Sequence, residues 1–254
     1  MGNRAIITTR EEYDNNTLGL YLHWNGGRDS VEAFLAYCKL RGDRSPEEDG
    51  YGYARLAQII GNWFGGTLSV GVMSGPQDWA SGCDNGAYIV KNWEIVGREE
   101  YGDWPEQDEY DLLEMMLDID EAQPERERLG SELISAYVLE LRFPITYEEK
   151  LELLEVGSKV IVNTYEGWNT YEVLGFGETG RITNGHDVSG VPFFNSTKYY
   201  ERYMASFKLD ENNPDDLEKI KDNINSYLVK DKRFYLPNRP EHVEYCQRSL
   251  IDLI

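Results

Sequence analysis

Four acidic side chains follow one another at intervals of three or four residues between positions 111 and 121. They are Asp111, Glu114, Asp118 and Glu121. On a helix this spacing places the four carboxylates on one side, with neighbouring side chains about 5–6 Å apart. Phosphates of a nucleic-acid strand, which advance about 3.4 Å per nucleotide along the axis, form a comparable row. We therefore expect this face to contact a basic surface, with Trp104 and Tyr110 as aromatic anchors of the interface.

The negative charge of the chain is concentrated around this row. The 254 residues carry a formal net charge of −21. Residues 94–152 contain 19 acids and 5 bases, a net charge of −14, whereas residues 1–93 and 153–254 carry −3 and −4. A charge that served only solubility would be spread over the whole surface. The acidic balance argues against direct binding to nucleic acid or to an anionic membrane surface, because both require clustered Lys and Arg.

A second candidate site is the turn Asn25, Gly26, Gly27 and Arg28, which stands directly before a predicted helix. Backbone N–H groups at such a turn, together with the Arg28 guanidinium, could bind an anionic ligand. The alternative is a tight connection between a strand and a helix that needs glycine for its conformation. The residues that follow predict a capping box, with Asp29 at the N-cap and Glu32 three residues later.

The sequence supplies little for metal or nucleophilic chemistry. Its three histidines are His23, His186 and His242, and they form no H-E-x-x-H or other ligand spacing. No G-x-S-x-G elbow is present, and the three cysteines are far apart. We expect no metal and no cofactor and assign no catalytic residue, which favours a binding protein over an enzyme.

The elements that would position these residues begin with an α+β unit. Residues 1–98 predict the order ββ-αα-ββ, from alternation in the strands and three-to-four-residue apolar periodicity in the helices. The expected strands are 5–9, 18–24, 67–73 and 86–96, and the expected helices begin at Asp29 and near Gly52 and end near Gly42 and Trp63.

The rest of the chain predicts three further parts. Residues 99–149 form an acidic helical segment, in which a helix starts at Pro105 and turns Leu112, Leu113, Met116 and Ile119 inward. Residues 150–200 form a small β module that an SH3-like barrel would fit, and residues 201–254 form a helical tail. The fold class is therefore α+β throughout.

Three strings in the first hundred residues carry a resemblance to a known group. They are Leu18-Gly-Leu-Tyr-Leu-His-Trp-Asn-Gly-Gly, Tyr53-Ala-Arg-Leu-Ala-Gln-Ile-Ile-Gly-Asn-Trp-Phe-Gly-Gly and Asp84-Asn-Gly-Ala-Tyr-Ile-Val. Together they resemble uncharacterised acidic accessory proteins of phages and mobile elements of Gram-positive bacteria. The resemblance implies a setting, an accessory gene that acts against a host system, and no functional residues.

These observations favour an acidic binding protein that mimics nucleic acid and occupies the basic groove of a host nuclease or DNA-binding protein. The alternatives are a small-ligand-binding protein or enzyme that uses Asn25–Arg28, and an adaptor whose contact surface is the β module. The N-terminus has no signal-peptide pattern, and no run of 18 apolar residues occurs. We therefore expect a cytoplasmic protein, located in the host cytoplasm if a phage encodes it.

Overall fold

The computed structural model describes eleven stretches of the chain. They are residues 2–9, 17–48, 50–74, 82–99, 109–155, 157–164, 167–176, 180–181, 187–188, 192–195 and 234–237. The chain divides into two compact units, residues 1–134 and 135–254, and each is described by itself. Both helices and sheets are present, so the chain is an α+β protein, as the sequence predicts.

The first unit is built on a five-stranded mixed sheet. Its strands are β1 (Ala5–Thr8), β2 (Leu18–Leu22), β3 (Val70–Ser74), β4 (Ala87–Lys91) and β5 (Glu94–Glu99). Their order in the sheet is β3-β2-β1-β4-β5, with β1 parallel to β4 and every other pair antiparallel. The central strand β1 pairs on both edges and is buried along its whole length. The observed order is ββ-αα-βββ, so the predicted order ββ-αα-ββ is correct up to β3 and has one strand too few after it.

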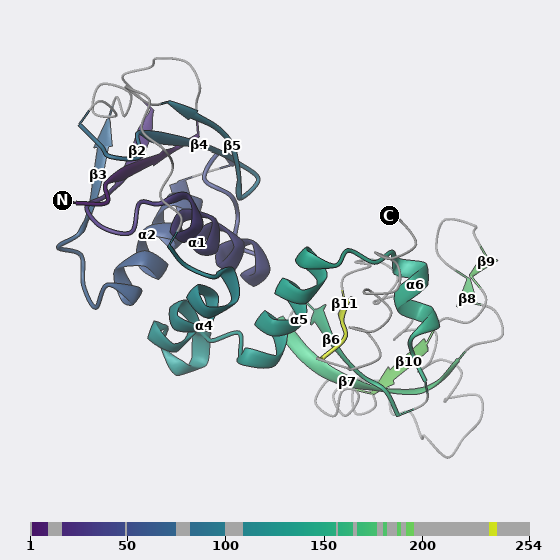
Figure 1. The fold of residues 1–254 in the computed structure, drawn as a ribbon. Helices are drawn as coiled ribbons and strands as arrows, with labels where there is room; N and C mark the ends of the chain where they lie inside the picture. The colour runs from purple at the N-terminus through teal and green to yellow at the C-terminus, as the bar shows by residue number, and fades with distance from the viewer. Residues whose placement is uncertain are drawn as a thin grey trace. The chain divides into compact units, whose positions relative to one another are not determined.

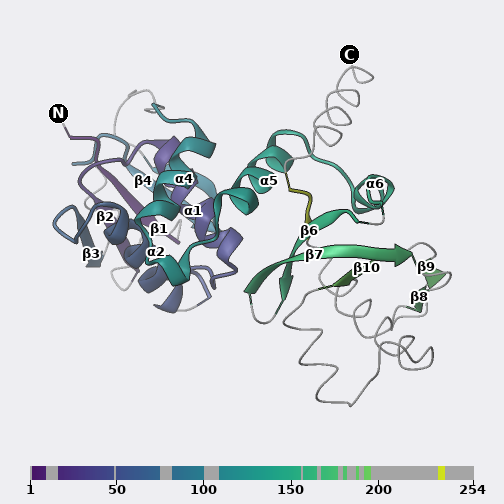
Figure 2. The ribbon, with the colours of Figure 1, turned by 90° about the horizontal axis from the view of Figure 1, so that it is seen from below.

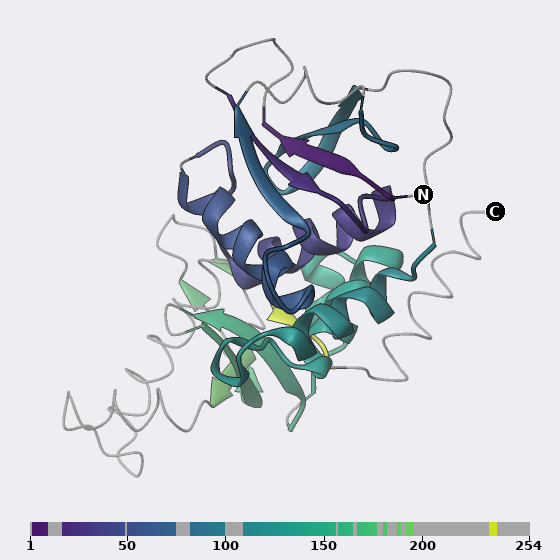
Figure 3. The ribbon, with the colours of Figure 1, turned by 90° about the vertical axis from the view of Figure 1, so that its left-hand side faces the viewer.

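Two helices cover one face of this sheet, and a third packs on them (Figures 1 and 3). They are α1 (Arg28–Arg41), α2 (Gly50–Trp63) and α4 (Leu112–Ala122), followed by a 3-10 turn at Glu125–Glu127. The core side chains of α1 include Val31, Phe34 and Leu35, all almost fully buried. The sheet, α1 with α2, and α4 thus form successive layers.

The strand expected over residues 86–96 is wrong, because the chain reverses there. β4 and β5 form a hairpin whose turn is Asn92-Trp93, with φ of 51° and 62°. Tryptophan rarely occupies this left-handed region, which costs a residue with a side chain about 1 kcal/mol or more. Here burial of the Trp93 ring and a 2.8 Å hydrogen bond from its Nε1 to the Asp43 carbonyl stabilise the turn.

The start of α1 also differs from the prediction. Gly27 is the N-cap residue and makes no side-chain capping bond, whereas Asp29 lies in the first turn. The Asp29 carboxylate bonds in two directions: Oδ1 accepts the Ser30 N–H of its own helix at 2.6 Å, and Oδ2 accepts the backbone N–H groups of Glu109 and Tyr110, at 2.5 and 2.6 Å. The side chain therefore joins the start of α1 to the segment that leads into α4.

The second unit contains a four-stranded antiparallel sheet (Figure 2). Its strands are β6 (Lys159–Thr164), β7 (Gly167–Phe176), β10 (Pro192–Asn195) and β11 (Phe234–Tyr235), in the order β10-β7-β6-β11. A two-stranded ladder joins β8 (Gly180–Arg181) and β9 (Asp187–Val188). Of the predicted helical tail, residues 201–254, the structure describes residues 234–237, which contain the strand β11. The helices predicted there lie outside the described residues.

Helices α5 (Ser131–Arg142) and α6 (Tyr147–Glu152) precede this sheet, and the boundary between the units falls within α5. Lys150 joins parts of the second unit, because its buried Nζ lies 2.6 Å from Glu140 Oε1 and donates a 3.0 Å hydrogen bond to the Phe234 carbonyl. Burial raises the pKa of Glu140 above its ordinary value. None of the helices in the described residues has the length and apolarity that crossing a membrane requires.

Candidate functional site

The four predicted acids all lie at or on α4, and all four are exposed. The helix begins later than predicted, at Leu112 instead of Pro105, because Asp111 is its N-cap and accepts hydrogen bonds from the N–H groups of Leu113 and Glu114. Glu114, Asp118 and Glu121 then follow along the helix. At about 1.5 Å of rise per residue, their positions are about 6 and about 4.5 Å apart along its axis.

The opposite side of α4 is held in the core of the first unit. Met115, Met116 and Ile119 are buried against the neighbouring helices, whereas the expected Leu112 and Leu113 are only partly buried. The acidic face is therefore the outer side of a packed helix.

Asp120 is a residue that the sequence prediction missed. It is only 6% exposed and accepts a 2.6 Å hydrogen bond at Oδ1 from the hydroxyl of Tyr37, which is fully buried on α1. The same carboxylate accepts the backbone N–H groups of Leu129 and Gly130, at 2.6 and 3.1 Å. Burial, and then the bond to Asp120, raise the pKa of Tyr37. The sequence did contain a signal for this residue, because Asp120 is an acid on the apolar side of the predicted helix, directly after Ile119.

The two predicted aromatic anchors have different outcomes. Tyr110 precedes α4 with 45% of its surface exposed, and its backbone is fastened by Asp29. It is therefore available beside the acidic face. Trp104 lies outside the described residues.

The turn Asn25–Arg28 has a clear structural role. Asn25 adopts a left-handed φ of 52°, and Gly26 packs so tightly that a Cβ there would lie 2.6 Å from the Cβ and N of Ala5. The Gly26 N–H donates to the Asn3 carbonyl at 2.8 Å, and Arg28 Nε lies 2.7 Å from Glu32 Oε1. Gly27 is the N-cap of α1. Ligand binding at this turn stays a prediction.

The Cys83 side chain, which packs against Ile6 and Ala87, is not activated as a nucleophile. Burial raises the pKa of the Cys83 thiol to about 11, so at neutral pH it is protonated and a weak nucleophile. Its neighbour Asp84 pairs with Arg4 at 2.9 Å, and the hydrogen bonds from Arg4 lower the pKa of Asp84. Within the described part of the chain, no three His, Cys, Asp or Glu residues are grouped so as to hold a metal ion.

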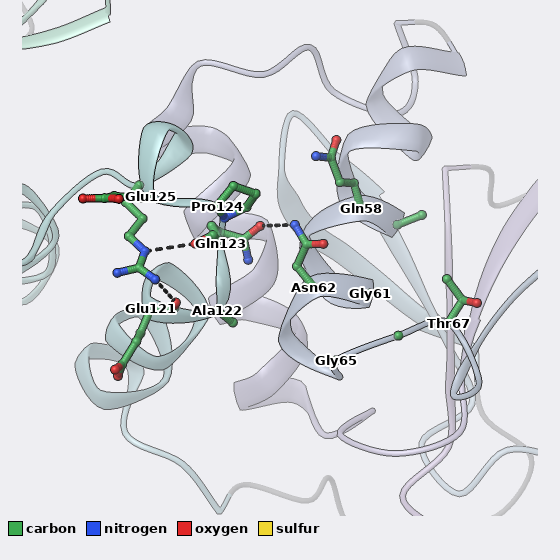
Figure 4. A pocket seen from close by; sticks show the side chains of 13 residues that line it. Gln58, Gly61, Asn62, Gly65, Thr67, Glu121, Ala122, Gln123, Pro124 and Glu125 are labelled. Carbon is green, nitrogen blue, oxygen red and sulfur yellow. Dashed lines mark hydrogen bonds between the residues drawn. The ribbon is translucent and has the colours of Figure 1, made fainter.

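An open groove of about 690 Å³ lies between the carboxyl-terminal ends of α2 and α4 (Figure 4). The buried side chain of Gln123 joins the two helices in its lining: Oε1 accepts a 2.9 Å hydrogen bond from Asn62, and Nε2 donates to the Ile59 and Ile119 carbonyls. Glu121, the last of the four predicted acids, lines this groove. The sequence prediction did not find the groove, because the residues that line it come from two distant segments.

Comparisons with models of protein families, with curated proteins and with solved structures gave no match. The resemblance of the first hundred residues to phage and mobile-element proteins thus stays a hypothesis.

Proposed function

We propose that this protein is a non-enzymatic binding protein whose acidic α4 face docks on the basic, nucleic-acid-binding surface of another protein. In this proposal the chain acts in the cytoplasm as an inhibitor encoded by a phage or mobile element, and it mimics nucleic acid before a host nuclease or DNA-binding protein. The supporting observation is that Asp111, Glu114, Asp118 and Glu121 are exposed together on one packed helix.

Packing matters to this proposal because a flexible acidic segment loses conformational entropy when it binds. The side chains of Met115, Met116 and Ile119 are buried, and Asp120 is bonded to Tyr37 and to two backbone N–H groups. A helix held in this way presents its carboxylates without a large ordering cost on binding.

Charge and spacing supply the second support. A chain segment with a formal net charge of −14 over 59 residues attracts a basic partner over a Debye length, about 10 Å at 0.1 M salt. Carboxylates that recur about every 4.5–6 Å along the helix axis offer a basic groove a row of anions similar to a phosphate backbone. An adaptor role, and SH3-like closure of the sheet in residues 150–200, stay predictions.

The test is capture of partners from a bacterial lysate at about 50 mM and about 500 mM salt, between which the Debye length differs about threefold. The test variant carries D111N, E114Q, D118N and E121Q. Asparagine retains the ability to cap α4, so the helix is preserved. The matched control neutralises four exposed acids outside α4 with the same charge change, namely E48Q, E132Q, E152Q and E155Q.

We expect a nuclease or DNA-binding protein to be captured at low salt by the wild type and by the control, and lost from the α4 variant. Equal capture by all three proteins contradicts the proposal, as does capture that high salt leaves unchanged.

A further inference from the structure

The groove between the ends of α2 and α4 has the chemistry of a site for a cation. Helix α2 ends at Trp63 and α4 at Ala122, and both carboxyl-terminal ends line the same cavity (Figure 4). The carboxyl-terminal end of a helix carries partial negative charge on carbonyls without partners inside the helix. The exposed side chains of Glu121 and Glu125 add two carboxylates to the lining.

The backbone donors of the groove are already used inside the protein. The Gly65 N–H donates to the Asn62 carbonyl at 3.0 Å, and the Gly66 N–H donates to the Gly61 carbonyl at 2.8 Å. These bonds close the end of α2 in a turn at Gly65, whose φ is +68°. These bonds leave the groove few backbone donors for an anion, whereas each bonded carbonyl keeps a second lone pair and Glu121 and Glu125 add two carboxylates. A cation therefore meets acceptors, with the Arg128 guanidinium as a positive charge already in the lining.

The chain itself shows that a guanidinium fits this surface. Arg128 donates from Nε to the Gln123 carbonyl at 2.9 Å and from Nη2 to the Glu121 carbonyl at 2.6 Å, beside the end of α4. The cavity of about 690 Å³ is the space that remains with Arg128 in place. Small residues leave this space open, since Ala57, Gly61 and Ala122 line it from the two helices.

We propose that this groove binds a long basic side chain of the partner, an arginine in particular, and so provides the specific anchor of the acidic face. This inference rests on the proposed function, because Glu121 belongs both to the α4 row and to the groove. The row attracts a basic surface in general. The groove selects a guanidinium, which is planar and can donate to several carbonyl and carboxylate oxygens at once.

The experiment titrates the full-length ¹⁵N-labelled protein with N-acetyl-argininamide and, separately, with N-acetyl-citrullinamide, which has the same shape without the charge. The amide signals of Gly61, Gly65 and Gly66 report on the groove. We expect the arginine probe to shift these three signals with a dissociation constant in the millimolar range, and the citrulline probe to leave them unchanged.

Two double variants with the same change in charge separate the groove from the row. The E121Q/E125Q variant is expected to weaken binding of the probe about three- to tenfold, whereas E114Q/D118N changes it less than twofold. Ala57→Trp fills the groove without a change in charge and is expected to abolish the glycine shifts. Its amide spectrum away from the groove verifies the fold.

Absence of shifts at the three glycines overturns the inference, and so does equal weakening by both double variants. Neither result refutes the proposed function, which is tested by partner capture with the four-residue α4 variant. If that variant loses partner capture and the groove binds no arginine, the four acids of α4 act only through their long-range electrostatic attraction.

Discussion

The bond between Tyr37 and Asp120 provides the sharpest test of how α4 is held. The bond is 2.6 Å long and joins a fully buried hydroxyl to a carboxylate that is 6% exposed. A hydrogen bond to a charged group contributes about 1.5–3 kcal/mol to stability. Tyr37→Phe should therefore lower the free energy of unfolding of the first unit by about that amount.

Asp120→Ala should cost more, about 3–5 kcal/mol, because it leaves the Tyr37 hydroxyl and the N–H groups of Leu129 and Gly130 without their acceptor. The double variant should cost less than the sum of the two single changes, since both remove the same bond.

Hydrogen exchange read by mass spectrometry suits this test, because it follows peptides of α1 and α4 separately from those of the second unit. Guanidinium denaturation gives the total change. Tyr110→Phe is the control, since 45% of the Tyr110 surface is exposed, and it should change stability by less than about 0.5 kcal/mol. A Tyr37→Phe variant as stable as this control would refute the reasoning, as would an Asp120→Ala variant no weaker than Tyr37→Phe.

Three further outcomes follow from contacts outside α4. Lys150→Met should destabilise the second unit by about 3–5 kcal/mol, because it leaves the Glu140 carboxylate without its cation. Burial already raises the pKa of Glu140, so the Lys150→Met protein should be stable at low pH, where Glu140 is protonated, and should lose stability as the pH rises through that raised pKa. Thermal melting over a pH series measures this, and a destabilisation that does not change with pH contradicts the role given to the Lys150–Glu140 pair. Gly26→Ala should cost about 1–3 kcal/mol in chemical denaturation, because its Cβ overlaps strand β1, whereas Gly50→Ala, with open space around it, should be neutral or slightly stabilising. The rate of alkylation of the Cys83 thiol should rise with pH toward a midpoint near 11. A midpoint near 8.5, the pKa of an ordinary thiol, would show that burial does not control the pKa of Cys83.

Local sequence patterns were sufficient for most of the first sheet and its helices. Apolar residues at helical spacing predicted α1 and α2, and alternation predicted β1, β2 and β3 close to their observed positions. The exposed position of the four acids at α4 also matches the prediction, because side-chain direction on a helix follows from spacing alone, whereas their contact with a partner stays a prediction. These features depend on neighbours within one or two turns of the chain.

The missed features depend on partners far away in the sequence. The Asn92-Trp93 turn is stabilised by the Asp43 carbonyl, 50 residues from Trp93. Asp29 lies inside the first turn of α1 and fastens the backbone at Glu109 and Tyr110, about 80 residues away. No local propensity contains such contacts, since tertiary packing provides the energy that overrides it.

The same dependence on distant partners explains why Asp120 and the groove were missed. Asp120 occupies a position that periodicity assigns to an apolar side chain, and only the buried Tyr37 hydroxyl and two backbone donors make it stable there. The groove combines the end of α2 with the end of α4, about 60 residues apart in the sequence, so spacing could not predict it.

The most direct test of the central claim is the rate of association with the captured partner, measured by stopped-flow fluorescence over a series of salt concentrations. The wild type is compared with the D111N/E114Q/D118N/E121Q variant and with the E48Q/E132Q/E152Q/E155Q control. If α4 directs binding, the α4 variant should associate about tenfold or more slowly at low salt, and the difference should shrink as salt screens the charges. Equal rates for the two variants at every salt concentration would contradict the account, because total charge, and not the acidic face of α4, would then drive association.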